Sequence, residues 1–320
     1  MAKRPAARPL ATIMASALVV SCAAEEPPPP AVGPAPDLVE KALDVPGFAD
    51  FLAVDGDTVW VTNGGRVEQW STSGKVASVP VPRPCGTMAI AEGSLWVANC
   101  KGAEIYRINL ETAQLEAKVA SGLANPKGET NVVAGAGSVW VASDPDGAVA
   151  RIDPATNAVI ATIAVAPETW YLAYGFDALW AVSSEGKVLQ KIDPATNAVT
   201  GTVALGDTPG FLAAGEGAVW VQEQGDGTVA KVDPAGLTVA GRTKVGDNLK
   251  WGDIDTGGGA VWLRTTDDQT LVVIDPQTLA IRARLGKAVG SGALRWTPAG
   301  VWTSAHDNQT LSWWSAPAAR

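Results

Sequence analysis

The chain has 320 residues, of which 47% are hydrophobic and 18% are charged, and its net charge is −9. Without Lys3, Arg4 and Arg8 at its start, 21 basic residues face 33 acidic ones, which gives a net charge of −12. A surface that binds nucleic acid needs clustered Lys and Arg, so this acidic balance argues against nucleic acid as a partner.

The first 36 residues differ in kind from the rest. A basic start is followed by an apolar stretch at residues 10–20, too short to span a bilayer, and then by Val-Val-Ser-Cys at residues 19–22. This pattern is typical of an export signal, and its ending resembles the lipobox of bacterial lipoproteins, in which the Cys becomes the lipidated first residue. We therefore predict a signal peptide at residues 1–21 and a lipid on Cys22 that attaches the exported protein to the cell envelope. The alternative is an uncleaved core helix with a buried Cys.

Residues 22–36 contain Pro27 to Pro30 and two further prolines. Such a segment favours an extended, stiff and unpacked conformation, so we predict a tether that holds the remaining residues, 37–320, off the membrane surface.

From residue 37 onward one pattern recurs at intervals close to 40 residues: a turn, a small residue, an aliphatic residue and a Trp. Around each Trp the sequence predicts four short antiparallel strands separated by turn residues. Seven such units are typical of a seven-bladed β-propeller, an all-β fold in which a large flat side chain fills the wedge between neighbouring blades. The recurring residues are Trp60, Trp96, Trp140, Trp180, Trp220, Trp262 and Trp302.

An Asp-Pro step follows the predicted third strand in four units, at Asp153, Asp193, Asp233 and Asp275. Pro favours the second position of a type I turn, and the Asp carboxylate accepts backbone N–H groups. We interpret these carboxylates as turn residues and not as catalytic groups.

The last unit ends at Arg320 without a fourth strand, whereas residues 38–45 precede the first unit and alternate like a fourth strand. We predict that residues 38–45 complete the seventh blade, which would close the ring and remove an exposed sheet edge.

With Cys22 assigned to the lipid, Cys85 and Cys100 remain. They flank the first two strands of the second blade, and their midpoint falls in the Glu92-Gly93 turn, so in a hairpin they would lie opposite each other. We predict a disulfide, with two free buried thiols as the alternative. With a single His in the chain, a Cys and His metal site is not expected.

The phrases Gly-Ser-Val-Trp-Val-Ala-Ser and Arg-Ile-Asp-Pro-Ala-Thr-Asn-Ala-Val-Ile-Ala-Thr-Ile resemble the bacterial seven-bladed propellers that include the YVTN-repeat proteins and the streptogramin (virginiamycin B) lyases. The lyase branch implies opening of a cyclic depsipeptide by elimination at its ester bond, with a divalent metal and a His general base. This chain departs from that pattern because it has one His, His306, where the lyases use more than one together with Glu residues.

Off-pattern charges mark blades five to seven. Seven residues before the Trp, small or aliphatic residues give way to Asp255 and Arg295; two residues after it they give way to Gln222 and Arg264. Because first strands line the channel of a propeller, we expect Asp255, Arg264 and Arg295 to converge near the axis or a blade interface. They would form either a structural ion pair or a polar ligand pocket.

The loops at one end of the ring predict a recognition surface, and Trp170 and Trp251 lie there outside the repeated Trp position; each Trp could equally cap its blade. The residues expected on this face are Asn99, Lys101, Glu129, Glu168, Trp170, Glu223, Lys250, Trp251, Asp253 and His306.

Two functions follow from these residues. The first is a monomeric, non-catalytic, membrane-tethered propeller without cofactor that binds a protein, peptide or glycan through its loops. The second is a lyase-like enzyme that uses His306, Glu223 and Asp253 with a divalent metal.

Overall fold

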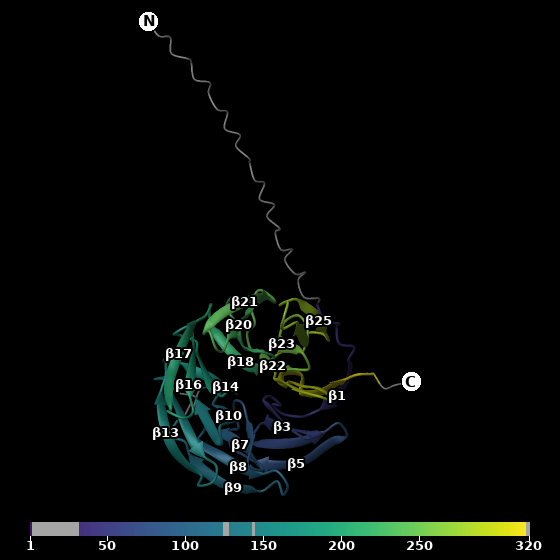
Figure 1. Ribbon diagram of the computed structural model, residues 1–320. Coiled ribbons are helices and arrows are strands. Elements are labelled where there is room, and N and C mark those ends of the chain that lie inside the picture. Colours follow the sequence, from purple (N-terminus) through teal and green to yellow (C-terminus); the bar gives the residue numbers. More distant parts are fainter. Residues whose placement is uncertain (2–31, 124–127, 143–144, 318–320) are drawn as a thin grey trace. The chain divides into compact units, whose positions relative to one another are not determined.

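The computed structural model describes residue 1 and residues 32–123, 128–142 and 145–317. The predicted signal peptide, Cys22 and most of the tether lie outside the described residues. From residue 32 onward the chain forms seven four-stranded antiparallel sheets, which follow one another around a ring as the blades of a propeller (Figure 1). This confirms the predicted fold class.

In blades one to six the strand order within each sheet is the order along the chain. Blades one to three consist of β2 (Leu52–Asp55), β3 (Thr58–Asn63), β4 (Arg66–Ser71), β5 (Gly74–Pro80); β6 (Ala89–Ala91), β7 (Ser94–Asn99), β8 (Glu104–Asn109), β9 (Leu115–Ala120); and β10 (Asn131–Gly135), β11 (Ser138–Ala142), β12 (Ala148–Asp153), β13 (Ala158–Ala164). Blades four to six consist of β14 (Thr169–Gly175), β15 (Ala178–Ser183), β16 (Val188–Asp193), β17 (Ala198–Ala204); β18 (Pro209–Gly215), β19 (Ala218–Glu223), β20 (Thr228–Asp233), β21 (Thr238–Lys244); and β22 (Asp253–Gly257), β23 (Ala260–Arg264), β24 (Leu271–Ile274), β25 (Ile281–Leu285).

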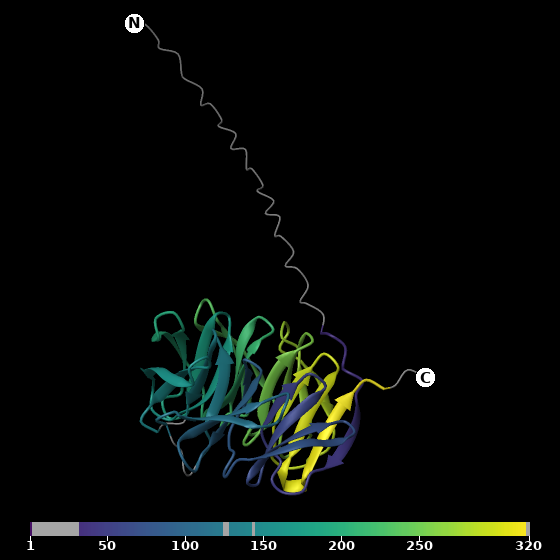
Figure 2. The ribbon, with the colours of Figure 1, turned by 90° about the horizontal axis from the view of Figure 1, so that it is seen from below.

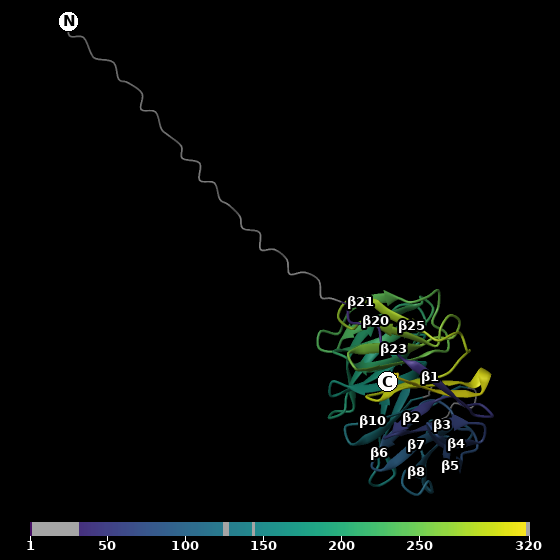
Figure 3. The same cartoon turned by 90° about the vertical axis from the view of Figure 1, so that its right-hand side faces the viewer.

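The seventh blade joins the two ends of the propeller. It contains β26 (Leu294–Thr297), β27 (Gly300–Ala305) and β28 (Thr310–Ser315), and its fourth strand is β1 (Val39–Asp44). β1 is antiparallel to β28 from Val39 opposite Ser315 to Asp44 opposite Thr310, and the two strands lie side by side in Figure 3. The predicted closure by residues 38–45 is therefore confirmed.

The two faces of the ring differ in what they carry. We call the side where first strands begin and second strands end the loop face. The opposite face carries the tight turns between first and second strands and the Asp-Pro turns. The chain enters β1 and leaves β28 at the opposite face (Figure 2), where the backbone N–H of Gly33 donates to Asp275 Oδ2 at 2.9 Å.

The repeated Trp residues pack between blades, as predicted. Six are at most 1% exposed and Trp262 is 6% exposed. Trp96 of blade two packs in one cluster with Val139, Val141 and Ile152 of blade three, so each indole stabilises an interface and not only its own sheet.

A cation reinforces four of these interfaces. Directly opposite the Trp on the third strand lies an Arg or Lys, and its charged group sits over the indole ring: 5.0 Å from the ring centre for Arg107, 4.7 Å for Arg151, and 5.5 Å for both Lys191 and Lys231. The same group donates to the carbonyl of the Pro in the Asp-Pro turn of the next blade, at 2.5 Å for Arg151 and Pro194 and at 2.6 Å for Lys231 and Pro276. Each of these Asp-Pro turns thus ties its blade to the preceding one, a role that the sequence analysis did not assign.

The Asp side chains of these turns act as predicted. Asp153, Asp193 and Asp233 each accept the backbone N–H two residues later at 2.8–2.9 Å. Asp275 accepts those of Gln277 and Thr278, both at 2.9 Å.

Cys85 and Cys100 form a disulfide with a Cα–Cα distance of 6.1 Å, which confirms the predicted pairing. A disulfide indicates an oxidising, extracytoplasmic compartment. Within the described part of the chain, no helix has the length and hydropathy needed to cross a bilayer.

Candidate functional site

The loop face contains a cavity of about 490 Å³, which we call the loop-face cavity. Its walls come from blade-to-blade connections and from the first strands of blades four to six. Its aromatic lining residues are Phe48, Phe51, Tyr171, Phe211, Trp251 and His306, and its acidic ones are Asp50, Glu129, Asp253 and Asp307. Aromatic walls with a few convergent polar groups are typical of a ligand site.

A second cavity of about 370 Å³ adjoins the first. The two share Phe48, Asp50, Phe51 and Glu129, and the second continues along Arg83, Pro84 and Cys85. The Cys85–Cys100 disulfide therefore fixes part of its wall. We call the two cavities together the loop-face groove.

A third cavity of about 350 Å³ lies in the central channel, between the first strands. It shares Tyr171, Phe211 and Asp253 with the loop-face cavity. The channel is therefore hollow on both sides of these residues.

The residues at this level hold the same position in the repeat, nine residues before each Trp. Two of them are in aromatic contact, with the rings of Tyr171 and Phe211 4.1 Å apart, and Phe51 lies 6.3 Å from Phe211. The complete series around the ring is Phe51, Thr87, Asn131, Tyr171, Phe211, Asp253 and Ala293. Phe51, Tyr171 and Phe211 were not predicted, because the off-pattern residues were sought seven before and two after the Trp. The three large aromatic side chains at the ninth position before the Trp were nevertheless visible in the repeat.

Tyr171 shares the channel side of its strand with Ala173, two residues later, and both line the channel cavity. The Tyr171 hydroxyl donates to Glu129 Oε2 at 3.3 Å. A β-bulge precedes this stretch: Thr169 pairs with Ser183 and Tyr171 with Val182, so Trp170 is the extra residue.

Two carboxyl groups of the groove have raised pKa values, which favour their neutral form. Burial, followed by the nearby Glu129 and Asp253 carboxylates, raises the pKa of Asp50 to about 8, although the buried Arg264 opposes this. Burial likewise raises the pKa of Glu129 to about 7, against the hydrogen bond from Tyr171. No described residue donates a hydrogen bond to the Asp50 carboxylate, and sequence reasoning had not singled Asp50 out.

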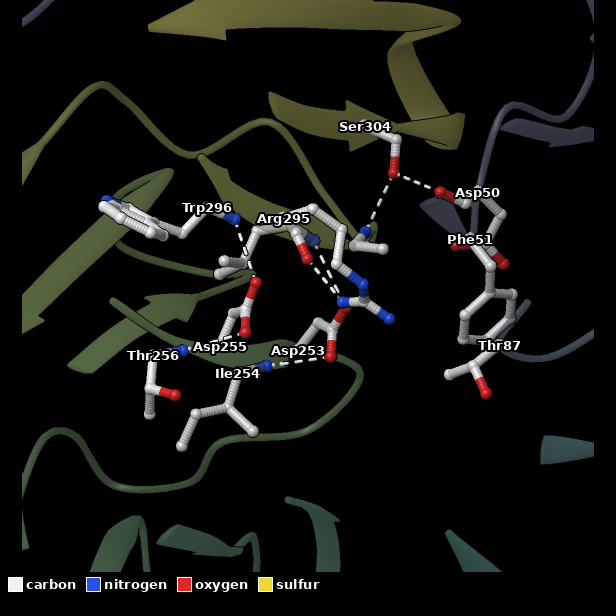
Figure 4. Close-up of polar contacts among 12 residues, drawn as sticks. Asp50, Phe51, Thr87, Asp253, Ile254, Asp255, Thr256, Arg295, Trp296 and Ser304 are labelled. Carbon is white, nitrogen blue, oxygen red and sulfur yellow. Dashed lines mark hydrogen bonds and ion pairs between the residues drawn. The ribbon is translucent and has the colours of Figure 1, made fainter. Parts of the chain in front are cut away.

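The off-pattern charges divide into two groups. Two carboxylates of blade six contact blade seven: Asp253 Oδ2 lies 2.6 Å from Arg295 Nη1, and Asp255 Oδ2 accepts the backbone N–H of Trp296 at 2.9 Å (Figure 4). The first contact is an ion pair between neighbouring blades, and Arg295 and Asp255 also line the channel cavity. The partner of Arg295 is thus Asp253, which we had placed among the catalytic candidates.

Arg264 makes different contacts. It is 1% exposed and donates to the carbonyl oxygens of Ser304 at 3.1 Å, Gly290 at 2.8 Å and Thr265. Its side chain lines none of the three cavities described above, and it supports the blade-seven loops that form one wall of the groove. All three charges therefore lie at the interface between blades six and seven, one of the two locations predicted from the sequence. Asp255 and Arg295 also line the channel cavity, whereas Arg264 does not.

His306 begins the short 3₁₀ helix η1 (His306–Asn308) and lines the loop-face cavity. Its ring stacks on Phe48 with centroids 4.1 Å apart, and its Nδ1 lies 3.2 Å from Asp307 Oδ1. Burial lowers the pKa of His306 below its usual 6.5, so the imidazole is mainly neutral at pH 7.

Trp251 has a left-handed backbone, with φ of 55°, and a 68% exposed side chain at the edge of the cavity. Many other turn residues of the described chain share this backbone conformation, so the exposed ring at the cavity edge is what makes Trp251 a candidate contact residue.

The other predicted residues lie outside the groove. Glu223 is fully buried and accepts two hydrogen bonds from the Arg242 guanidinium, at 2.8 and 2.9 Å. Asn99 is buried, and its Oδ1 accepts the backbone N–H of Arg83 at 3.2 Å. Lys250 lines a separate cavity of about 140 Å³. Lys101, Glu168 and Trp170 line none of the cavities described here.

A metal site does not fit these residues. Among the described residues, no group of three or more His, Cys, Asp or Glu is placed to hold a metal ion. Two candidate ligands are already engaged by cations, Glu223 by Arg242 and Asp253 by Arg295.

Comparison with known proteins supports the fold. No family model and no curated protein sequence matches the chain. Among solved structures, a catalytically inactive His-to-Ala variant of virginiamycin B lyase from Staphylococcus aureus with quinupristin is 14% identical, with a TM-score of 0.75, over 88% of this chain and 100% of that chain. Selenomethionine-substituted virginiamycin B lyase from S. aureus has a TM-score of 0.74 at 14% identity, over 88% of this chain and 100% of that one. A streptogramin B lyase has a TM-score of 0.73 at 12% identity, over 88% of this chain and 98% of that one. At such identities the likeness shows a shared fold, and in fold this chain is a seven-bladed β-propeller similar to the streptogramin B lyases.

Proposed function

We propose that this chain is a non-catalytic, exported binding protein that holds a peptide segment in the loop-face groove. The observation that carries the proposal is the pair of joined cavities of about 490 and 370 Å³ with four shared lining residues. An elongated hollow suits an extended chain better than a compact molecule. The exposed rings of Phe48 and Trp251, 53% and 68% exposed, supply apolar contact at its edge.

The engagement of the catalytic candidates favours binding over chemistry. Glu223 is held by Arg242 away from the cavity lining, and Asp253 is paired with Arg295. Both carboxylates are therefore held in ion pairs of the propeller itself. Of the three catalytic candidates, only His306 is not paired with an Arg.

The proposal includes a lipid anchor at Cys22 and a Pro-rich tether, as predicted from the sequence. The tether reaches the ring at Gly33, which bonds Asp275 on the face opposite the groove. A propeller attached at this face presents its groove on the other face, toward soluble peptides.

Panning a random peptide library on the purified chain, followed by calorimetry with the selected peptides, tests the binding function. We expect Trp251→Ala to weaken binding by about 1–3 kcal/mol, because an exposed aromatic at a binding edge is a typical hot spot. Trp170→Ala is the matched control, since this second non-repeated Trp lies outside the groove. Failure to select any peptide, or equal loss in both variants, would contradict the proposal.

A second candidate function, a lyase, rests on one observation: His306 lines a cavity in a fold shared with lyases, one of which was solved as an inactive His-to-Ala variant with quinupristin. A mainly neutral imidazole is able to accept a proton as a general base. Incubation of the chain with virginiamycin B, followed by mass spectrometry, tests it. Ring opening that is lost in His306→Ala would replace the binding proposal, and an unchanged depsipeptide would remove the lyase.

A further inference from the structure

We propose that the loop-face cavity recognises a primary alkylammonium group, with the carboxylates of Asp50 and Glu129 as its counter-charges and the surrounding aromatic rings as its walls. The inference rests on the proposed function and names the chemical group that the groove selects in its ligand.

Among the described residues, the charged side chains that line the cavity are all acidic. Four acidic side chains line it, from Asp50, Glu129, Asp253 and Asp307, and no Lys or Arg among the described residues does. The nearby cations are engaged elsewhere: Arg264 with three carbonyls and Arg295 with Asp253. Arg83 lines the adjoining second cavity only, where its Nη2 lies 3.5 Å from the carbonyl oxygen of Gly128.

Asp50 lacks the partners that a protein normally supplies to an enclosed carboxylate. Asp253 is paired with Arg295, and Glu129 receives a hydrogen bond from Tyr171. The Asp50 carboxylate accepts no hydrogen bond from any described residue, although Asp50 lines both cavities of the groove; only its backbone carbonyl accepts one, from Ser304 Oγ. A largely enclosed carboxylate is stable in its charged form only beside a donor or a cation, and a ligand ammonium group would supply both.

The aromatic rings give the site its preference for an organic cation over a metal ion. Phe51, Tyr171 and Phe211 form a cluster at the level of the channel, and the stacked Phe48 and His306 form another wall. Aromatic faces attract an ammonium group and also contact its methylene chain. A bare divalent ion would need several oxygen ligands in one place, which the described residues do not provide.

Binding should be linked to protons. Asp50, with a pKa of about 8, is mainly neutral at pH 7, and an ammonium group favours its charged form, so binding releases protons. The groups facing Asp50 are Glu129, Asp253, Asp307 and Arg264, and those facing Glu129 are Tyr171 and Asp253. The affinity should therefore rise between pH 6 and pH 8.5, while the ligand amine stays charged. Protonation of His306 at low pH acts in the same direction.

The test is calorimetric titration of the chain with n-butylammonium chloride, with n-butanol as its neutral counterpart. We expect binding of the amine and not of the alcohol, proton release measured in buffers of different ionisation enthalpy, and a loss of about tenfold or more in Asp50→Asn and Glu129→Gln. Asp57→Asn, an exposed Asp of the β2–β3 turn, is the matched control and should bind like the unmodified chain. Equal binding of the alcohol, or unchanged affinity in both groove variants, would overturn the inference.

Acetylated peptides show which group of the ligand supplies the ammonium. Acetylation of a lysine side chain in a selected peptide should weaken binding about tenfold if the group is a lysine, and acetylation of the peptide N-terminus should do so if it is the free terminus. If peptides bind equally after both acetylations, the inference fails and the peptide-binding function stands. If the free amine binds and no peptide does, the peptide-binding function fails and the ammonium site stands.

Discussion

At the residue scale, Asp50 shows how a preformed ligand site can lower the stability of the folded protein. Its carboxylate lies in a largely enclosed position near Glu129 and Asp253 and without a hydrogen-bond donor, and these conditions raise its pKa to about 8. In the unfolded chain an Asp titrates near pH 4. Between about pH 4 and pH 8 the folded chain therefore keeps a proton on Asp50 that the unfolded chain has lost. The free energy of unfolding consequently falls as the pH rises from about 4 to about 8.

Asp50→Asn should remove this pH dependence. We expect the variant to be more stable than the unmodified chain by on the order of 5 kcal/mol at pH 8, with the difference vanishing near pH 4, because the amide carries no charge at either pH. Urea denaturation at several pH values measures it. Asp57→Asn serves as the exposed control, and a difference that grows toward low pH would contradict the explanation.

The sequence predicted part of the candidate site. Asp253, Trp251, Glu129 and His306 were expected on the loop face, and all four line the cavity. Asp50 could not be identified, because its importance comes from the lack of partners in the folded ring and not from any motif. Glu223 looked free in the sequence, but Arg242 from the fourth strand of the same blade forms an ion pair with it.

At the scale of elements, the cation opposite the repeated Trp joins one blade to the next. Arg151 lies over Trp140, donates to Ser138 Oγ at 2.8 Å and reaches Pro194 O and Asn197 Oδ1 of the following blade. The donor is charged, the Trp is buried, and the acceptors are a hydroxyl, a backbone carbonyl and a side-chain amide oxygen.

Arg151→Met should destabilise the protein by about 1–3 kcal/mol, since the apolar stem still packs on the indole while the charged hydrogen bonds are lost. Arg151→Lys should retain most of the stability, because Lys occupies the same position in blades four and five and reaches the same carbonyl there. Thermal unfolding of the three proteins decides the question, and equal stability of the Met and Lys variants would show that the charged contacts contribute nothing.

The disulfide is a second contact that joins elements: it closes a loop around β6 and β7, with a sequence separation of 15 between its cysteines. Replacing both Cys85 and Cys100 by Ser should cost about 3 kcal/mol, because the unfolded chain is no longer constrained. The same substitutions should loosen the groove wall at Cys85 and weaken peptide binding. Denaturation with and without reductant measures the first effect. A reductant that destabilises the double variant as much as the unmodified chain would contradict this assignment.

At the scale of the whole molecule, the ring depends on β1. Removal of residues 1–36 should leave a folded propeller, whereas removal of residues 1–44 should leave β28 as an open edge with the apolar residues of blade seven exposed, so we expect aggregation or unfolding of that chain. Circular dichroism and size-exclusion chromatography of the two truncated proteins provide the comparison. A monomeric, fully folded protein without residues 1–44 would show that closure by β1 is dispensable.

The fold could be predicted well because each of its units repeats the same Trp, Gly turn and, in most blades, Asp-Pro step, so every copy supported the interpretation of the others. The missing fourth strand after β28 was visible for the same reason. The cavities were not predictable, because their volumes depend on which side chains meet across the channel from blades far apart in the sequence. Phe51 and Phe211, whose ring centroids are 6.3 Å apart, come close only because the ring brings blades one and five together at the channel.

The pairing of Val39 with Ser315 also determines the order of events when the chain is made. Of the strands, β1 is synthesised first and its partner β28 last, so β1 has no strand partner until β28 has emerged. Pairing two strands so distant in the sequence is slow. During this interval an apolar strand would invite association with other chains. β1 instead carries Glu40, Lys41 and Asp44, all exposed, and these charges disfavour wrong pairing while the correct partner is still being produced.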